Sequence, residues 1–168
     1  PATVALAREV ARQAVVVLEN RGVLPLDPGR GQRIALIGPT ADDPLALLCG
    51  YSFPVHLILN DAGEAAAQVV TPRAAFEKAF GAGRVAHAQG CFIIEERKYG
   101  SPVFPGDVEK STTLDQPSPV SRRTDLIPAA VACARGADVA VVCVGDLAGL
   151  FQPGTIGEGS DADSLDLP

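Results

Sequence analysis

Three short apolar runs, each reached through a helical pattern, set the predicted order of elements. The runs cover residues 33–38, 84–88 and 138–144, and they are bounded by Gly, Pro and other turn residues. Apolar residues predominate in these runs without a regular alternation over their length, which is typical of strands covered on both faces. The sequence therefore predicts three buried strands in the order helix, strand, helix, strand, helix, strand.

The three predicted helices carry recognisable start and stop signals. The first covers residues 4–19 with an apolar stripe and stops at Asn20-Arg21-Gly22. The second covers 72–80 with Thr71 as N-cap, and the third covers 125–135 with Thr124 or Asp125 as cap and Gly136 after its end.

This order predicts an α/β protein, a three-layer α/β sandwich with a mostly parallel sheet and right-handed crossovers. Residues 91–124 are rich in Pro, Gly, Ser and Thr and show neither the helical nor the strand periodicity of apolar residues, so we expect a long irregular excursion there. The chain stops after the third run, and we expect the sandwich to be incomplete at its C-terminal end.

Composition places the 168 residues in one globular domain, because 47% of them are hydrophobic and 20% charged. The sequence contains no Met, even at position 1, so we expect a piece of a longer or processed protein. A net charge of −6 argues against a nucleic-acid partner, and no apolar run reaches the roughly 18 residues of a membrane span. We expect a soluble protein, and both cytoplasmic and secreted locations stay open.

Several common chemistries lack their motifs. The four cysteines form no Cys-x-x-Cys pair of the zinc or redox type. After the first predicted strand the sequence has one glycine, Gly38, whereas a dinucleotide-binding fingerprint needs three. The two histidines have no Ser or Cys partner in a Gly-x-Ser-x-Gly nucleophile elbow. The doublet Asp42-Asp43 precedes Pro44, where capping explains it. We assign no metal site and no cofactor.

The candidate site is the loop after the third run, where Glu158 lies between Gly157 and Gly159. Ligands of open α/β sheets bind outside the carboxyl ends of the strands, which makes a carboxylate on such a loop a natural candidate. Asp146, directly after the strand, either faces the same pocket or caps the loop, and capping is the commoner role of such a residue.

An ordered set of short motifs along nearly the whole chain resembles the second domain of glycoside hydrolase family 3. The set comprises Val15-Val16-Val17-Leu18-Glu19-Asn20, Leu24-Pro25-Leu26, residues 34–42, Gly50-Tyr51-Ser52, Gly90-Cys91, residues 137–142, Gly157-Glu158-Gly159-x-Asp161 and Leu165-x-Leu167-Pro168. The resemblance implies a β-glucosidase or β-xylosidase type of protein, in which a (β/α)8 barrel carries the nucleophile and this domain leans a loop over the barrel mouth. Nothing in this chain resembles the barrel, so we expect the chain alone to be inactive.

The resemblance also implies the roles of the site residues. Glu158 is the expected acid/base of a retaining exo-acting β-glycosidase, and Asp161 is an acceptor for a sugar hydroxyl or for the loop. Phe151, with Leu150, supplies an apolar setting, and Tyr51 lines a substrate subsite or packs beneath the loop. The family often has Arg after the position of Asp161, where this chain has Ala162. The alternative is a non-catalytic scaffold or interaction domain of the same fold.

Overall fold

The computed structural model describes residues 2–48, 69–95, 120–148, 154–157 and 164–168. These residues form two compact units, 1–30 and 31–168. In the described part of the chain, no helix combines the length and the apolar composition needed to cross a membrane.

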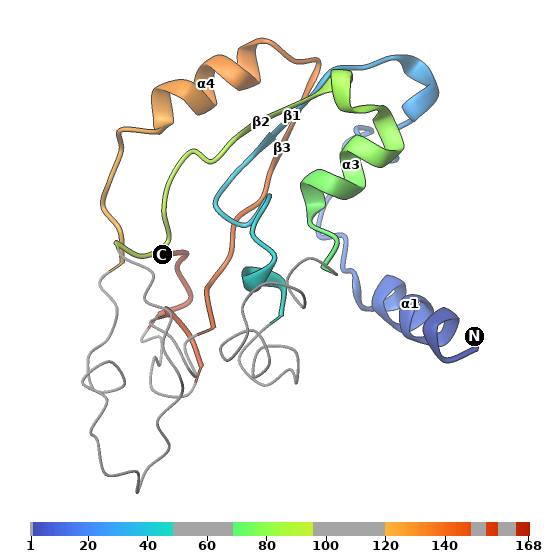
Figure 1. Ribbon diagram of the computed structural model, residues 1–168, viewed down its shortest axis with the longest axis horizontal. Helices are drawn as coiled ribbons and strands as arrows, with labels where there is room; N and C mark the ends of the chain where they lie inside the picture. Colours follow the sequence, from blue (N-terminus) through green and yellow to red (C-terminus); the bar gives the residue numbers. More distant parts are fainter. Residues whose placement is uncertain (1, 49–68, 96–119, 149–153, 158–163) are drawn as a thin grey trace, which may run out of the picture. The chain divides into compact units, whose positions relative to one another are not determined.

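The larger unit is built on a parallel three-stranded sheet in the order β2-β1-β3 (Figure 1). Strand β1 is Ile34–Ile37, β2 is Val85–Ala88 and β3 is Val139–Val142. Ile34 is in register with Val85 on one side and with Val139 on the other. All four residues of the central strand are buried, which explains its continuous apolar pattern.

Two helices lie on opposite sides of this sheet (Figure 1). Helix α3 (Pro72–Phe80) connects β1 to β2, and α4 (Ile127–Arg135) connects β2 to β3. The two connections step across the sheet in opposite directions, so right-handed crossovers require helices on opposite faces. The predicted α/β class, with a parallel sheet between two layers of helix, is confirmed.

Small side chains let α4 approach its face of the sheet. Ala35, Ile37 and Ala130 form a buried cluster, and further small residues of β2, of α4 and of the turn after α4 pack against it: Ala88, Cys133, Ala134 and Ala137. On α3, the rings of Phe76 and Phe80 stack with centroids 5.6 Å apart, and Phe80 is buried. The sheet therefore packs against an alanine-rich helix on one face and has an aromatic pair on the helix of the other face.

The helix boundaries follow local chemistry. Thr71 caps α3 as predicted, since its hydroxyl accepts a hydrogen bond from Ala74 N at 3.2 Å. The predicted side-chain cap of α4 is wrong: Leu126 is the N-cap and makes no such bond, because Asp125 is paired with Arg123 at 2.7 Å. The described part of the larger unit also contains two three-residue 3-10 helices, η2 (Leu45–Leu47) and η4 (Ala82–Arg84).

The smaller unit contains α1 (Ala2–Ala14) and the 3-10 helix η1 (Pro28–Arg30). The helix is shorter than the predicted 4–19, because the β-branched residues Val15 to Val17 disfavour continuation. The predicted stop at Asn20 is a turn, in which the Asn20 side chain bonds both the N–H and the C=O of Leu24, at 3.1 and 2.8 Å. No residue of α1 is buried, so its apolar stripe is exposed in this unit.

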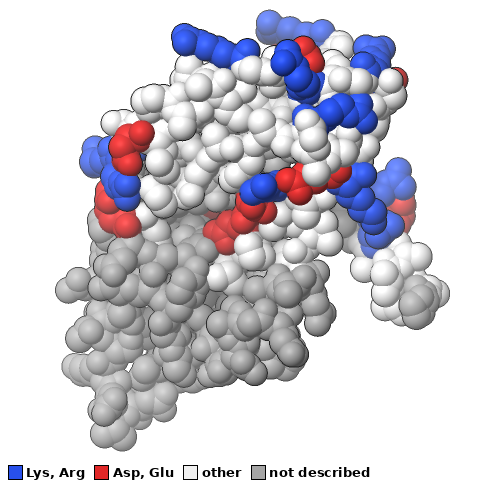
Figure 2. Space-filling view, turned by 45° about the horizontal axis from the view of Figure 1, so that its top comes forward, with Lys and Arg blue, Asp and Glu red and all other residues white. Residues whose placement is uncertain are grey.

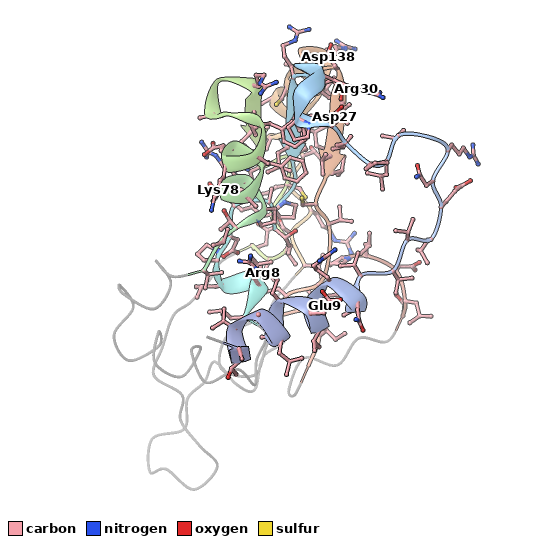
Figure 3. All side chains as sticks on the ribbon, turned by 90° about the vertical axis from the view of Figure 1, so that its right-hand side faces the viewer. Arg8, Glu9, Asp27, Arg30, Lys78 and Asp138 are labelled. Atoms are coloured by element: carbon pink, nitrogen blue, oxygen red, sulfur yellow. The ribbon has the colours of Figure 1, made fainter. Side chains whose placement is uncertain are left out.

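Asp138 joins the beginnings of β1 and β3, at the upper end of the strands in Figure 3. Its carboxylate accepts the backbone N–H of Arg33 at 2.8 Å, and the Arg33 guanidinium lies 3.6 Å away. The backbone bond first, and the side chain second, hold the pKa of Asp138 below its ordinary value. The carboxylate therefore stabilises the fold only while it is ionised.

Asp138→Asn is expected to remove an acid-dependent part of the stability. A carboxyl whose pKa is lowered by folding stabilises above its unfolded pKa of about 3.9, and this contribution disappears as the pH falls through the folded pKa. The variant should melt below wild type at neutral pH, and the difference should close below about pH 4. Thermal unfolding across this range is the measurement, with Glu9→Gln on exposed α1 as control. A pH-independent difference would contradict the assignment.

Gly38 ends β1 in a conformation that only glycine adopts without strain. Its φ is +126°, and a Cβ at this position would overlap the carbonyl oxygen of Cys143. The close approach accompanies a hydrogen bond of 2.7 Å from Cys143 N to Ile37 O. Gly38 thus lets the strand ends β1 and β3 come together.

Gly38→Ala is expected to destabilise this unit by about 2 kcal/mol or more, through the strained φ and the backbone overlap. Thermal unfolding of the protein that carries this chain measures the effect. Gly83→Ala is the matched control, because its added Cβ meets no atom within 4 Å. Equal melting temperatures for the two variants would contradict the close approach.

Candidate active site

The carboxyl ends of the three strands meet at one edge of the sheet. Gly38 follows β1 and donates its N–H to Ala88 O at the end of β2, at 3.1 Å. Figure 1 shows all three strands running toward the same end of this unit. In the order β2-β1-β3 the connection from β1 to β2 and the connection from β2 to β3 step across the sheet in opposite directions, and ligands of open α/β sheets bind outside the carboxyl ends of the strands.

Asp42 holds the end of β1 to the beginning of α3. Its two carboxylate oxygens accept the Thr71 hydroxyl at 2.9 Å and the Arg73 guanidinium at 3.0 Å. Arg73 also bonds Glu77, and these two carboxylates raise the pKa of Arg73, with Glu77 contributing most. Asp42 therefore has a structural role.

Asp43 shapes the next turn, since its carboxylate accepts Leu45 N at 2.9 Å and Ala46 N at 3.4 Å. These contacts confirm the predicted turn capping for Asp43, whereas Asp42 accepts two side-chain donors, Thr71 and Arg73. Among the residues that the structure describes, no group of three His, Cys, Asp or Glu side chains is arranged to hold a metal ion.

Two adjoining hollows lie beside these turns. One has a volume of about 250 Å³ and the other of about 310 Å³, and both are lined by Pro39, Asp43 and Gln89. The first is also lined by Phe92, Ile93, Ile94, Glu95 and Leu147, and the second by Gly38, Asp42, Pro44 and His87. The apolar lining and the carboxylate and amide groups can accept a ligand that carries several hydroxyl donors.

A small apolar cluster forms the base of the first hollow. Ile93, Ile94 and Leu147 are buried together, with Ala46 against them. Ile94 pairs with Val120 in an antiparallel bridge, and Ser121 N donates to Ile93 O at 2.9 Å. These bonds join the two described ends of the predicted excursion 91–124 at the carboxyl edge of the sheet.

One wall of the hollow is reinforced by a cation–π contact. The Arg123 guanidinium lies 4.6 Å from the centre of the Phe92 ring and is paired with Asp125 at 2.7 Å. Next to it, Glu95 accepts Arg122 N at 3.0 Å. Phe92 therefore presents one ring face to Arg123.

The segment after β3 closes on itself through four hydrogen bonds. The Thr155 hydroxyl donates to Asp146 Oδ1 at 2.9 Å and accepts Leu147 N at 2.9 Å. In return, Leu147 O accepts Thr155 N at 2.8 Å and Ile156 N at 3.3 Å. We call this arrangement of residues 146, 147, 155 and 156 the loop clamp. Asp146 fixes the loop within it, in agreement with its predicted capping role.

Carboxylates and arginines lie together at the carboxyl edge of this unit. Asp42, Asp43, Glu95 and Asp146 follow the strands. Arg73 lies 3.0 Å from Asp42 and Arg123 lies 2.7 Å from Asp125, so two arginines pair with carboxylates there. Figure 2 likewise shows Asp and Glu side chains (red) beside Lys and Arg side chains (blue) in the middle and at the left of this face.

All four predicted site residues lie outside the described residues: Glu158, Asp161, Phe151 and Tyr51. The structure describes the chain up to Gly157, with φ +102°, directly before Glu158. Sequence reasoning missed Gln89 and Thr155. The position of Gln89 directly after a predicted strand was an available signal, but an isolated Thr in a loop gives none.

Comparison with known proteins identifies the family. Residues 15–168 match the family model of the glycosyl hydrolase family 3 C-terminal domain. The periplasmic beta-glucosidase of Salmonella typhimurium is 34% identical over 164 residues, which are 96% of this chain and 19% of that protein.

Solved structures agree with the fold. A β-glucosidase from Erythrobacter marinus has a TM-score of 0.57 and 28% identity, covering 95% of this chain and 19% of that one. A β-glucosidase involved in saponin metabolism, from intestinal bacteria, has a TM-score of 0.63 and 24% identity, covering 95% and 20%. The chain spans about a fifth of the length of these relatives. The chain therefore belongs to the glycosyl hydrolase family 3 C-terminal domain family.

Proposed function

We propose that this chain is the second domain of a retaining exo-acting β-glycosidase of the β-glucosidase or β-xylosidase type, and that Glu158 is its acid/base. The loop clamp is the observation that carries this proposal. It ties Thr155 and Ile156 to Leu147, which is 1% exposed, so the segment leading to Glu158 starts from a buried point at the carboxyl edge. A general acid needs such a fixed origin, because proton transfer depends on geometry.

The proposed reaction uses two carboxyl groups about 5 Å apart. A nucleophile attacks the anomeric carbon while Glu158 donates its proton to the leaving oxygen, which breaks the glycosidic bond. Glu158, now ionised, takes a proton from water as that water attacks the same carbon and releases the nucleophile. Both steps are balanced by these two groups, so the reaction as proposed uses no metal or cofactor.

The remaining predicted residues have supporting roles in this proposal. Asp161 accepts a hydrogen bond from a sugar hydroxyl or from the loop, and Phe151 and Tyr51 line the substrate site. The hollow beside Gln89 and Glu95 lies at the same edge of the sheet and offers further acceptors to a carbohydrate.

The nucleophile belongs, in this proposal, to a (β/α)8 barrel domain elsewhere in the parent protein. The relatives are about five times as long as this chain, which leaves ample length for such a domain. The chain alone is then one half of an active site and hydrolyses nothing by itself.

Replacement of Glu158 in the full-length parent tests the proposal. Glu158→Ala and Glu158→Gln should lower kcat/KM on a β-linked disaccharide by roughly 10²–10⁴-fold, the usual contribution of a general acid. The kcat/KM of these variants on dinitrophenyl β-glucoside should stay close to the wild-type value, because its leaving group departs without a proton. Azide should raise kcat of Glu158→Ala on this substrate by replacing the base-assisted water.

Asp166→Asn is the matched control, since it neutralises an exposed carboxylate near the same end of the chain. Wild-type rates for both Glu158 variants on the disaccharide would remove Glu158 from the chemistry. The alternative of a non-catalytic scaffold domain would then be favoured.

A further inference from the structure

Thr155 is the centre of the loop clamp. Its hydroxyl is used twice, as donor to Asp146 and as acceptor from Leu147 N, both at 2.9 Å. Its backbone N–H makes a third bond to Leu147 O, at 2.8 Å. A carboxylate is an acceptor only, so the group between it and a backbone N–H must both donate and accept, as a hydroxyl does.

The partner of Thr155 is fixed in the core. Leu147 packs against Ile93 and Ile94 at the base of the hollow, and Ala148 bridges Ile156 in parallel. A shift of Thr155 relative to Leu147 therefore breaks these bonds. The clamp therefore ties Thr155 and Ile156 to the segment after β3.

Glu158 follows Thr155 by only three residues, a span of at most roughly 10 Å when extended. Only Ile156 and Gly157 lie between the two residues, so a displacement at Thr155 changes the point from which Glu158 follows. A misplacement of about 1 Å can cost about 10²-fold in rate.

We infer that Thr155 is a positioning residue for the acid/base, and that Asp146 orients its hydroxyl. The inference rests on the proposed role of Glu158. It adds a residue that touches neither substrate nor nucleophile, and whose hydroxyl acts through the placement of the Glu158 loop.

Two variants of the full-length parent separate positioning from packing. Thr155→Val keeps the shape and loses the hydroxyl, whereas Thr155→Ser keeps the hydroxyl. Thr155→Val should lower kcat/KM on a β-linked disaccharide about 10- to 100-fold and leave dinitrophenyl β-glucoside nearly unchanged, because only the first needs proton donation. Thr155→Ser should stay close to wild type on both substrates.

A purely structural role predicts a different pattern. If Thr155→Val loses activity equally on both substrates, or loses none on the disaccharide, the inference is overturned. Should Thr155→Val not fold, Asp146→Ala and Asp146→Asn take its place, because Asn retains the oxygen that accepts the Thr155 hydroxyl. Asp146→Ala alone should then show the selective loss on the disaccharide, and an equal loss for both Asp146 variants would overturn the inference.

The background Glu158→Ala distinguishes this inference from the proposed function. If Thr155 acts through Glu158, adding Thr155→Val to Glu158→Ala should cause no further loss on the disaccharide, since the two residues act as a unit. Glu158→Ala at wild-type rates would refute the proposed function itself. A defective Glu158→Ala beside an unaffected Thr155→Val would refute only the role of Thr155.

Discussion

The larger unit depends on the parallel pairing of β1 with a strand on each side. Ile34, Ala35 and Leu36 have no exposed surface, and their backbone groups face β2 and β3 in register. Because all three strands run the same way, their carboxyl ends meet at one edge, and each helical connection crosses a face of the sheet. The positions of the hollows, of the excursion and of the clamped loop all follow from this arrangement.

Backbone contacts connect the central strand to the loops that follow the strands. Gly38 admits Cys143 at close range, and Leu147 is then buried against Ile93 and Ile94. The backbone N–H of Leu147 bonds the Thr155 hydroxyl, and its C=O accepts the N–H groups of Thr155 and Ile156. Among the described residues beside Leu147, the carboxylates of Asp43 and Asp146 fix turns.

The sequence predicts the elements better than it predicts the site. Apolar runs and caps located all three strands and α3, because buried parallel strands and a Thr-Pro helix start leave local signals. The first helix ended early, at Ala14, because the β-branched run Val15 to Val17 disfavours its continuation. The cap of α4 differed because Asp125 is paired with Arg123. The loop clamp joins residues eight and nine positions apart, and no periodicity of the sequence predicts such bonds. The roles of Glu158, Asp161, Phe151 and Tyr51 remain predictions.

The sugar product formed with azide tests whether Glu158 is the acid/base of a retaining reaction, as we propose. The full-length Glu158→Ala variant would be incubated with dinitrophenyl β-glucoside and azide, and the sugar product identified by proton NMR. We expect β-glucosyl azide, formed when azide attacks a covalent glycosyl-enzyme from the face that water would use. An α-glucosyl azide, or glucose alone at the wild-type rate, would contradict this proposal.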